Sequence, residues 1–185
     1  MSLLYKVFPK LEHDLSFEIL SEHDMYYNCI GYSLGFVDYW VWPVYSGGFL
    51  IQNRRNCTKQ IKQFWPIGVN KDLTLNSFLR VYEIFGYELC TDDNIEYEPE
   101  YEKVLIYGTS EDNVTHAATV HNGYCISKLG SEELIKHNAK SITGKAYGEI
   151  LVAVRRRLNT NISDRATLMD NGGEIKTKII RDLDL

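Results

Sequence analysis

The chain has 185 residues, of which 44% are hydrophobic and 24% charged, values typical of one globular domain that buries its own core. Its formal net charge of −5 argues against a nucleic-acid partner, because neutralising phosphates needs a surplus of lysine and arginine. Since no stretch approaches the roughly 20 apolar residues of a membrane span, no membrane partner is expected either.

The cysteines and the N-terminus set further expectations. The four cysteines show no CxxC spacing, so we expect no metal, no redox motif and no cofactor; they are Cys29, Cys57, Cys90 and Cys125. The apolar run at the N-terminus is too short for a secretory signal. A cytoplasmic protein with reduced thiols is therefore the default expectation, and export without a cleavable signal is the alternative.

Residues 28–39 read as the first helix. Asn28 is a good N-cap, and Ile30, Leu34 and Val37 recur at the spacing of one apolar stripe. The two glycines inside this range lower helix propensity, so they suggest close approach to another backbone. We expect the helix to end at residues 40–43, before Pro43.

The next elements are a loop, a helix and a second loop. Residues 46–62 are polar and basic, which predicts a long surface loop. Residues 74–85 predict a helix, with Thr74 as its cap and Gly86 as its stop. Residues 91–102 are acidic, and we interpret them as a solvated loop because they lack the spacing and the glycine of a calcium site.

The second half of the chain is rich in strands. We predict strands over residues 103–107, 114–120, 124–129 and 146–154. Asn122-Gly123 predicts a tight hairpin between the second and third strands. Ser131 followed by acidic residues predicts a short helix over residues 131–137. The basic run 155–157 is interpreted as the solvated end of the last strand.

Together these elements predict an α+β fold. The helix that carries Cys29 should pack on an antiparallel sheet of about four to six strands. Residues 1–158 would form this domain. Residues 159–185 would be a C-terminal tail, either a hairpin or an arm that binds a protein partner.

The position of Cys29 is the first sign of chemistry. A thiol is a nucleophile only as thiolate, and free N–H groups at the start of a helix favour negative charge, so we expect the pKa of Cys29 to be lowered. Its own backbone N–H is free to donate to an oxyanion. The competing interpretation is a buried structural cysteine, because cysteine is among the most buried residue types.

A histidine on the predicted hairpin is the expected base. With Asn122-Gly123 as the turn, His116 and Ser127 lie on one face of neighbouring strands, so Ser127 can help to orient the imidazole. Ala117 and Ala118 beside His116 leave room for a packed helix. We therefore expect the Cys29 sulfur within about 3.5–4.5 Å of a His116 ring nitrogen.

The order of these residues resembles a known superfamily. A cysteine on a helix, a strand that opens with histidine and a neighbouring strand with a polar residue resemble the papain-like enzymes, above all the bacterial cysteine amidases and peptidases that cut peptidoglycan. Over residues 27–157 the chain resembles more closely an uncharacterised bacterial domain family of that group. The pieces that carry this resemblance are YNCIGYSLG, Trp42-Pro43, Trp65-Pro66, GYELC, VLIYG, THAA, ISKLG, His137 and Tyr147-Gly148.

The resemblance implies a papain-like fold and a thiol amidohydrolase or peptidase. Cys29 would form the acyl-enzyme, with His116 as base and acid and Ser127 as the third residue. The superfamily usually places Asn, Asp, His or Gln third, so His137, Glu149 and Asn122 are substitutes, in that order. Peptides, peptidoglycan and proteins are the expected substrates.

Two alternatives to simple hydrolysis stay open. The same dyad serves deamidases and transglutaminases, which differ in the amide that enters and in whether water or an amine completes the reaction. A non-catalytic binding module that keeps the scaffold is the other alternative.

We also expect four residues near Cys29 to bind substrate. Three are the tryptophans that flank the first helix in sequence, of which at least one should border the site, and the fourth is the helix cap: Trp40, Trp42, Trp65 and Asn28. Plain core packing is the competing interpretation for any one of the tryptophans.

Overall fold

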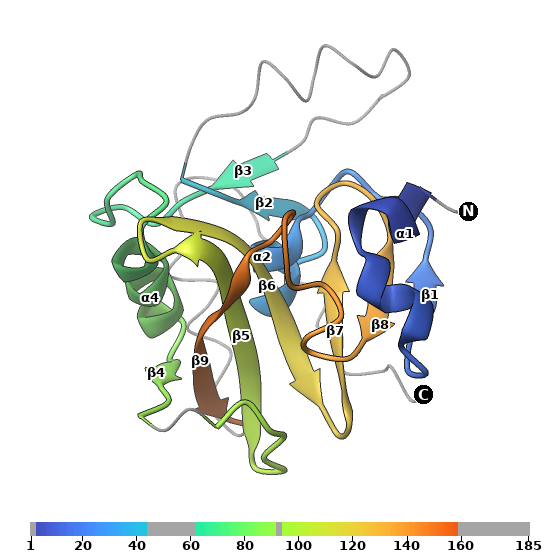
Figure 1. Ribbon diagram of the computed structural model, residues 1–185. Helices are drawn as coiled ribbons and strands as arrows, with labels where there is room; N and C mark the ends of the chain where they lie inside the picture. The colour runs from blue at the N-terminus through green and yellow to red at the C-terminus, as the bar shows by residue number, and fades with distance from the viewer. Residues whose placement is uncertain (1–2, 44–61, 92–93, 159–185) are drawn as a thin grey trace, which may run out of the picture.

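The fold is built on a seven-stranded antiparallel sheet, seen in a computed structural model that describes residues 3–43, 62–91 and 94–158 (Figure 1). The strand order is β1-β8-β7-β6-β5-β9-β4. The strands are β1 (Glu18–Ser21), β4 (Glu88–Leu89), β5 (Tyr101–Ser110), β6 (Asn113–His121), β7 (Tyr124–Lys128), β8 (Leu134–His137) and β9 (Glu149–Arg157). The mixed α+β class is as predicted, and the sheet is larger than the four to six strands expected.

Four short helices and a small second sheet complete the described part. The helices are α1 (Leu3–Val7), the 3-10 helix η1 (Pro9–His13), α2 (Cys29–Ser33) and α4 (Leu75–Ile84). Strands β2 (Tyr39–Val41) and β3 (Lys62–Phe64) pair in parallel. The predicted loop 46–62, apart from Lys62, and the tail 159–185 lie outside the described residues. None of the described helices is long and apolar enough to cross a bilayer.

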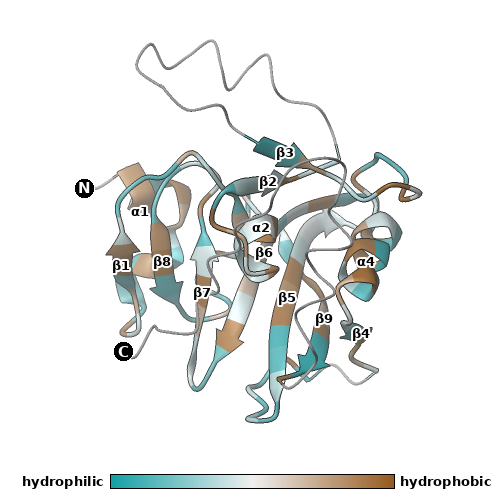
Figure 2. Ribbon diagram, turned by 180° about the vertical axis from the view of Figure 1, so that it is seen from behind, coloured by the Kyte–Doolittle hydropathy of each residue, from teal (hydrophilic) through white to brown (hydrophobic). Residues whose placement is uncertain are grey.

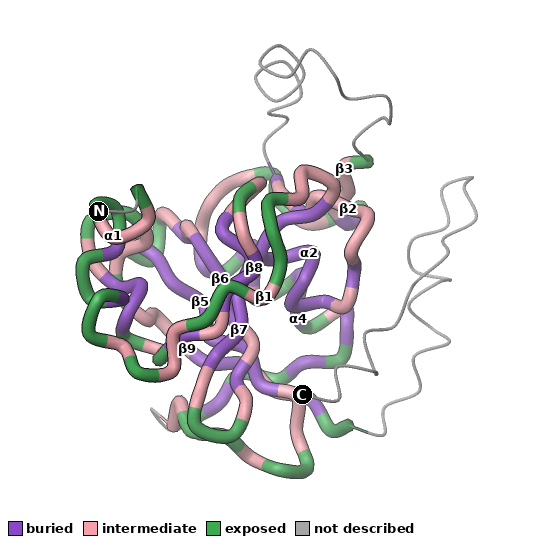
Figure 3. The backbone as a smooth tube through the Cα atoms, turned by 90° about the vertical axis from the view of Figure 1, so that its right-hand side faces the viewer, coloured by how far each residue is buried: buried purple, intermediate pink, exposed green. Residues whose placement is uncertain are grey.

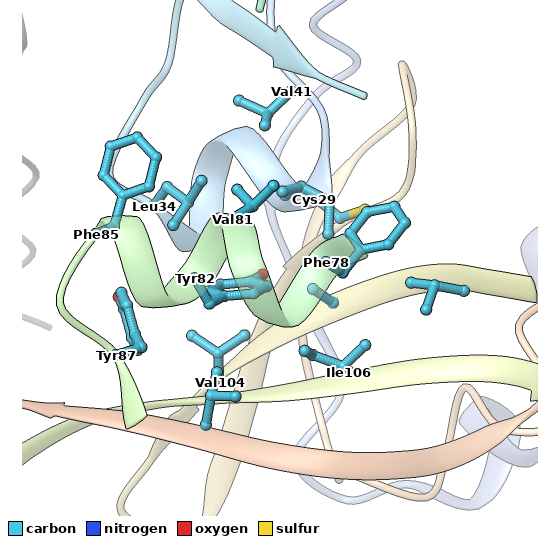
Figure 4. Packing of buried hydrophobic residues seen from close by; sticks show 14 of the residues in the cluster. Cys29, Leu34, Val41, Phe78, Val81, Tyr82, Phe85, Tyr87, Val104 and Ile106 are labelled. Atoms are coloured by element: carbon cyan, nitrogen blue, oxygen red, sulfur yellow. The ribbon is translucent and has the colours of Figure 1, made fainter. Parts of the chain in front are cut away.

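Each face of the sheet has its own hydrophobic core. Alternate residues of a strand point to opposite faces, and the two clusters follow this rule: Val104, Ile106 and Ala117 pack with α2 and α4, whereas Leu105, Tyr107 and Ala118 pack with the segment of α1 and η1. Figure 3 shows α2 buried and β1 largely exposed. Cys29 belongs to the first core, which Figure 4 shows from close by.

Helix α2 starts at the predicted residue and ends early. Gly35 takes a positive φ of 87°, and Phe36 donates its N–H to the carbonyl of Gly31, which closes the helix well before Pro43. Gly31 does mark a close approach, because a Cβ there would overlap the carbonyl oxygen of Tyr39. The approach is to β2, so the helix is held by its neighbouring segment as well as by the large sheet.

Helix α4 and the central strands follow the sequence closely. Thr74 caps α4 by accepting from the N–H of Ser77, and Gly86 follows the helix with a positive φ of 80°. The hairpin of β6 and β7 has the predicted register, with His121 opposite Tyr124. Figure 2 shows hydrophilic lower ends on β5 and β9, where these strands leave the core.

Two local predictions are wrong. Residues 131–137 are no helix: Leu129 and Glu133 close a turn by a backbone bond of 2.9 Å, and β8 then pairs with both β7 and β1. The run 155–157 is not simply solvated. Arg156 is buried, bonds Glu102 with its Nε at 2.5 Å and donates to the carbonyl of Phe85 at 3.1 Å.

Candidate active site

Asn28 fixes the start of the Cys29 helix. Its Oδ1 accepts from the N–H of Gly31 at 3.0 Å and from the N–H of Val41 at 3.1 Å, and its Nδ2 donates to the carbonyl of Val41 at 3.1 Å. The side chain thus caps α2 and ties it to β2. With 2% of its surface exposed, Asn28 has a structural role in this state, and its predicted role in substrate binding stays a prediction.

The Cys29 thiol lies at the backbone of β6. The backbone N–H groups of Ala117, Ile30 and Cys29 itself each lower the pKa of the thiol. Burial has the larger, opposite effect, because only 4% of the residue is exposed, and it raises the pKa of Cys29 to about 11. The expected lowering is therefore wrong for this state, in which the thiol is protonated. Figure 4 shows the sulfur beside the ring of Phe78.

His116 is completely buried and makes an unusual set of contacts. Its ring stacks on that of Tyr147, with centroids 3.9 Å apart and planes 8° from parallel, and lies 5.8 Å from Tyr107. Neither ring nitrogen has a hydrogen-bond partner among the described residues. Desolvation, with a smaller contribution from His137, holds the pKa of His116 well below its usual range, so the imidazole is neutral.

Cys29 and His116 form no hydrogen bond, since neither ring nitrogen of His116 has a partner among the described residues. His116 lies opposite Tyr107 in the ladder of β5 and β6, so its side chain leaves the face of the sheet that α2 does not cover. Ala117, the next residue, points toward α2 and Cys29. The two reactive groups therefore approach the same short piece of β6 from opposite faces.

Strands β6 and β7 separate at this piece of β6. Their ladder covers three pairs next to the hairpin and ends at Thr119 opposite Ile126, short of Ala117. Figures 1 and 2 show the two strands joined at the hairpin and diverging toward α2, which packs on both. Consequently the N–H of Ala117 faces the thiol instead of a strand partner.

Ser127 forms a hydrogen bond with His137, and not with His116 as had been expected. Its Oγ lies 2.9 Å from Nε2 of His137, and Nδ1 of His137 lies 2.8 Å from the carbonyl oxygen of Asn138. Both rings of this face are thus fixed, His137 by hydrogen bonds and His116 by stacking. Burial lowers the pKa of His137 to about 4. The expectation that Ser127 orients His116 is wrong, because β7 has turned away from that part of β6.

Of the three substitute residues, only His137 lies on the His116 face of the sheet. Asn122 is exposed at the hairpin turn, at the opposite end of β6. Glu149 is exposed at the start of β9, opposite Gly108. Neither position supports a role beside His116.

The tryptophans divide into two groups. Trp42 and Trp65 both pack their rings edge-on against Phe78, each with centroids 5.3 Å apart, and Phe78 belongs to the same core as Cys29. Trp40 instead donates its Nε1 to the carbonyl of Met25 at 2.6 Å. All three are partly exposed, and a role in substrate binding stays a prediction for each of them.

Two residues at this site were not foreseen. Tyr147 covers His116 from a loop that a pair of backbone bonds closes between Gly144 and Gly148. Lys128 ends β7 with no exposed surface, and its charge lowers the pKa of Cys29. The motifs ISKLG and Tyr147-Gly148 contain both residues, but nothing in their spacing indicates that they approach Cys29. Within the described ranges, no group of three or more His, Cys, Asp or Glu residues is arranged to hold a metal.

Comparison with known protein families identifies a domain that spans most of the described fold. The sheet and the helices define a mixed α+β protein, in which Cys29 and His116 lie near the point where β6 and β7 separate. The chain belongs to the family DUF7689, a domain of unknown function, whose model matches residues 18–155. No curated protein and no solved structure matches the chain.

Proposed function

We propose that this protein is a thiol-dependent amidohydrolase or peptidase with a papain-like fold, in which Cys29 is the nucleophile and His116 the base and acid. One observation carries the proposal. A cysteine at a capped helix start has its thiol pKa lowered by the backbone N–H groups of Cys29, Ile30 and Ala117, and Ala117 follows a buried histidine with two unpaired ring nitrogens. Leaving both nitrogens unpaired costs stability, which favours a functional reason for keeping the histidine.

The proposed reaction uses these groups in sequence. His116 accepts the thiol proton, Sγ attacks the amide carbon, and the N–H groups of Cys29 and Ala117 donate to the oxyanion that forms. The C–N bond then breaks, and the amine leaves with the proton from His116. Water, activated by the same imidazole, hydrolyses the thioester and restores the thiol.

Burial requires that the site opens. Cys29 has 4% of its surface exposed and His116 none, so substrate reaches them only after a neighbouring segment moves. Tyr147 is the candidate, because it is partly exposed and lies flat on His116. Displacing this loop would free the ring to turn toward the thiol where β6 and β7 separate.

A panel of amide substrates tests the proposal. Peptidoglycan stem peptides, unrelated peptides and a glutamine-rich protein would be incubated with the wild type, Cys29→Ala and the control Cys125→Ala. New amino termini indicate peptidase or amidase action, released ammonia indicates deamidation, and incorporation of an added amine indicates transfer. We expect Cys29→Ala to lose turnover by a factor on the order of 10³ or more, with little change in Cys125→Ala. Equal turnover in the wild type and Cys29→Ala would contradict the thiol mechanism.

The burial of both groups favours a second candidate, a non-catalytic binding module in which Cys29 and His116 are structural. This candidate predicts that no substrate is turned over and that Cys29→Ala binds its partner as the wild type does. A partner captured equally by both proteins, together with an inactive wild type, would support it.

A further inference from the structure

The N-terminal segment, residues 3–17, lies on the face of the sheet that carries His116 (Figure 1). It contains α1 and η1, and the backbone N–H groups of Phe8, Leu11 and Asp14 donate to carbonyls of the same segment. Phe8 and Leu11 are its two buried residues. A unit that closes its own backbone bonds and is held by side chains can detach while the sheet stays intact.

The segment contacts the Tyr147 loop, residues 138–148, which covers His116. The ring of Phe8 packs against the ring of Tyr147, with centroids 5.1 Å apart. Tyr147 also stacks on His116, with centroids 3.9 Å apart. Because Tyr147 touches both rings, moving it off His116 also disturbs its packing on Phe8.

Two polar contacts fix the rest of the Tyr147 loop to the same segment. At the start of the loop, Oδ2 of Asp14 accepts from the backbone N–H of Asn138 at 2.6 Å. Nearer the tip, Nζ of Lys10 donates to Oγ1 of Thr143, also at 2.6 Å. Lys10 and Asn138 are exposed, so water can replace each contact when it breaks. The segment therefore holds the loop at its start, its middle and its tip.

The other side of the Tyr147 loop rests on the sheet. Tyr107 donates its hydroxyl to the carbonyl of Ala139 at 2.9 Å, and Thr115 donates its hydroxyl to the carbonyl of Tyr147 at 2.6 Å. These two bonds seat the loop over His116. The loop thus lies between the sheet and the N-terminal segment, and it can lift only when the segment yields.

The match to the family separates the segment from the loop in sequence. It covers residues 18–155, which include the Tyr147 loop and His116 and leave out the N-terminal segment. A cover for the apolar core needs only apolar side chains such as Leu11, whereas Lys10 and Asp14 add two charged groups that both bind the loop. These two charges point to control of the loop.

We propose that the N-terminal segment is a clamp that keeps the Tyr147 loop closed over His116, and that its release opens the site. The inference rests on the proposed function, in which this loop must move before His116 can reach the thiol. The step is purely conformational: the segment moves away with its own backbone bonds intact, and the loop follows. The clamp acts on the face of the sheet opposite α2, so it controls the base and leaves the helix of Cys29 in place.

Labelling with diethyl pyrocarbonate measures the opening without any substrate, because this reagent acylates a neutral imidazole that water can reach. The rate would be read for each histidine by peptide mass spectrometry, with the exposed His23 as internal reference. The test variant, Lys10→Met with Asp14→Ala, removes both polar contacts with the loop. The matched control, Lys6→Met with Ser16→Ala, keeps them, since Lys6 is exposed on α1 and the Ser16 hydroxyl donates to Asp14 within the segment.

We expect the labelling rate of His116 to rise about tenfold in the test variant, because the closed loop loses two of the contacts that hold it. The control should keep the wild-type rate. Turnover of an amide substrate should rise together with the labelling rate. An unchanged labelling rate of His116 in a folded test variant would overturn the proposal. A raised labelling rate in a protein that turns over no amide would contradict the proposed function alone.

A second measurement uses the wild type and applies if the test variant does not fold. Amide hydrogen exchange followed by NMR reads the N–H of Asn138, which bonds Asp14, and those of Gly144 and Gly148, which bond each other's carbonyls. The clamp predicts that these loop amides open together with the N–H of Leu11 in the segment. Loop amides that stay protected while the segment opens would show that the segment does not hold the loop.

Discussion

The two faces of the sheet around β6 and β7 differ in the surroundings that they give to buried polar side chains. On the face under α2, the Cys29 thiol lies in an apolar core, where burial outweighs the backbone N–H groups and the Lys128 charge that lower its pKa. On the other face His116 and His137 are both buried, one stacked and one hydrogen-bonded. The comparison shows that Cys29 and His116 lie on different faces of the sheet, and that both are neutral at rest because burial dominates each pKa.

Of the substitutions that test this comparison, replacing His116 should reduce activity the most. His116→Phe keeps a flat ring for stacking on Tyr147 and removes two unpaired polar atoms. We expect activity to fall by about 10²–10⁴-fold, the usual contribution of a general base. The free energy of unfolding should stay equal or rise by about 1 kcal/mol, since no hydrogen bond is lost.

Denaturant unfolding and substrate turnover measure both quantities, and His121→Phe is the matched control. His121 stacks on Tyr124 near the hairpin turn, far along β6 from Ala117. It should lose no activity. A marked destabilisation of His116→Phe, with activity retained, would show that the imidazole is structural.

The pH dependence of stability should come mainly from the histidine face. Burial lowers the pKa of His137 to about 4, so the folded state binds its proton less readily than the unfolded state. Protonation of His137 therefore does not destabilise the folded state above about pH 6.5. As the pH falls below that value the free energy of unfolding decreases, and the decrease levels off below about pH 4 at a total on the order of 3 kcal/mol. His116 acts in the same direction.

Unfolding measured across this range in the wild type and His137→Asn would isolate the contribution of His137. The variant should show a shallower decline toward acid. Identical slopes would mean that the His137 ring is protonated in the folded protein, in conflict with its burial.

The smallest effect on activity is expected for a substitution of Ser127. Ser127→Ala leaves Nε2 of His137 without its partner at 2.9 Å, which should cost about 1–3 kcal/mol of unfolding free energy. Activity should fall by about tenfold or less, because Ser127 does not contact His116. Paired thermal unfolding and turnover assays check this. A loss as large as that of His116→Phe would place Ser127 in the chemistry.

Local sequence signals predicted much of the fold. The Asn28 cap, the Thr74 cap and the Asn122-Gly123 turn act over a few residues, and each appears where predicted. The four predicted strands correspond to β5, β6, β7 and β9, with ends that differ by up to three residues. The helix predicted over residues 131–137 does not form because residues 134–137 pair with β7 and with β1, which is distant in sequence, and this pairing outweighs the local cap signal of Ser131. Strand pairing of that kind is decided by tertiary contacts, which a local pattern does not contain.

The site was predictable in its residues and not in its geometry. Strand alternation correctly placed His116 and Ser127 on one face. It could not reveal that β7 leaves β6 after Ile126, which separates Ser127 from His116. The burial of Lys128 and the stacking of Tyr147 on His116 are tertiary contacts, which a local pattern does not contain, so neither residue was foreseen.

Trapping the acyl-enzyme tests the central claim most directly. The wild type, Cys29→Ala and His116→Phe would be incubated with a peptide-like acylating probe, and the adduct located by intact-mass and peptide mass spectrometry. The account predicts one adduct, on Cys29, which is absent in Cys29→Ala, strongly slowed in His116→Phe and lost on denaturation. Labelling of Cys90 or Cys125 at the same rate as Cys29, or of Cys29 at the same rate without His116, would contradict it.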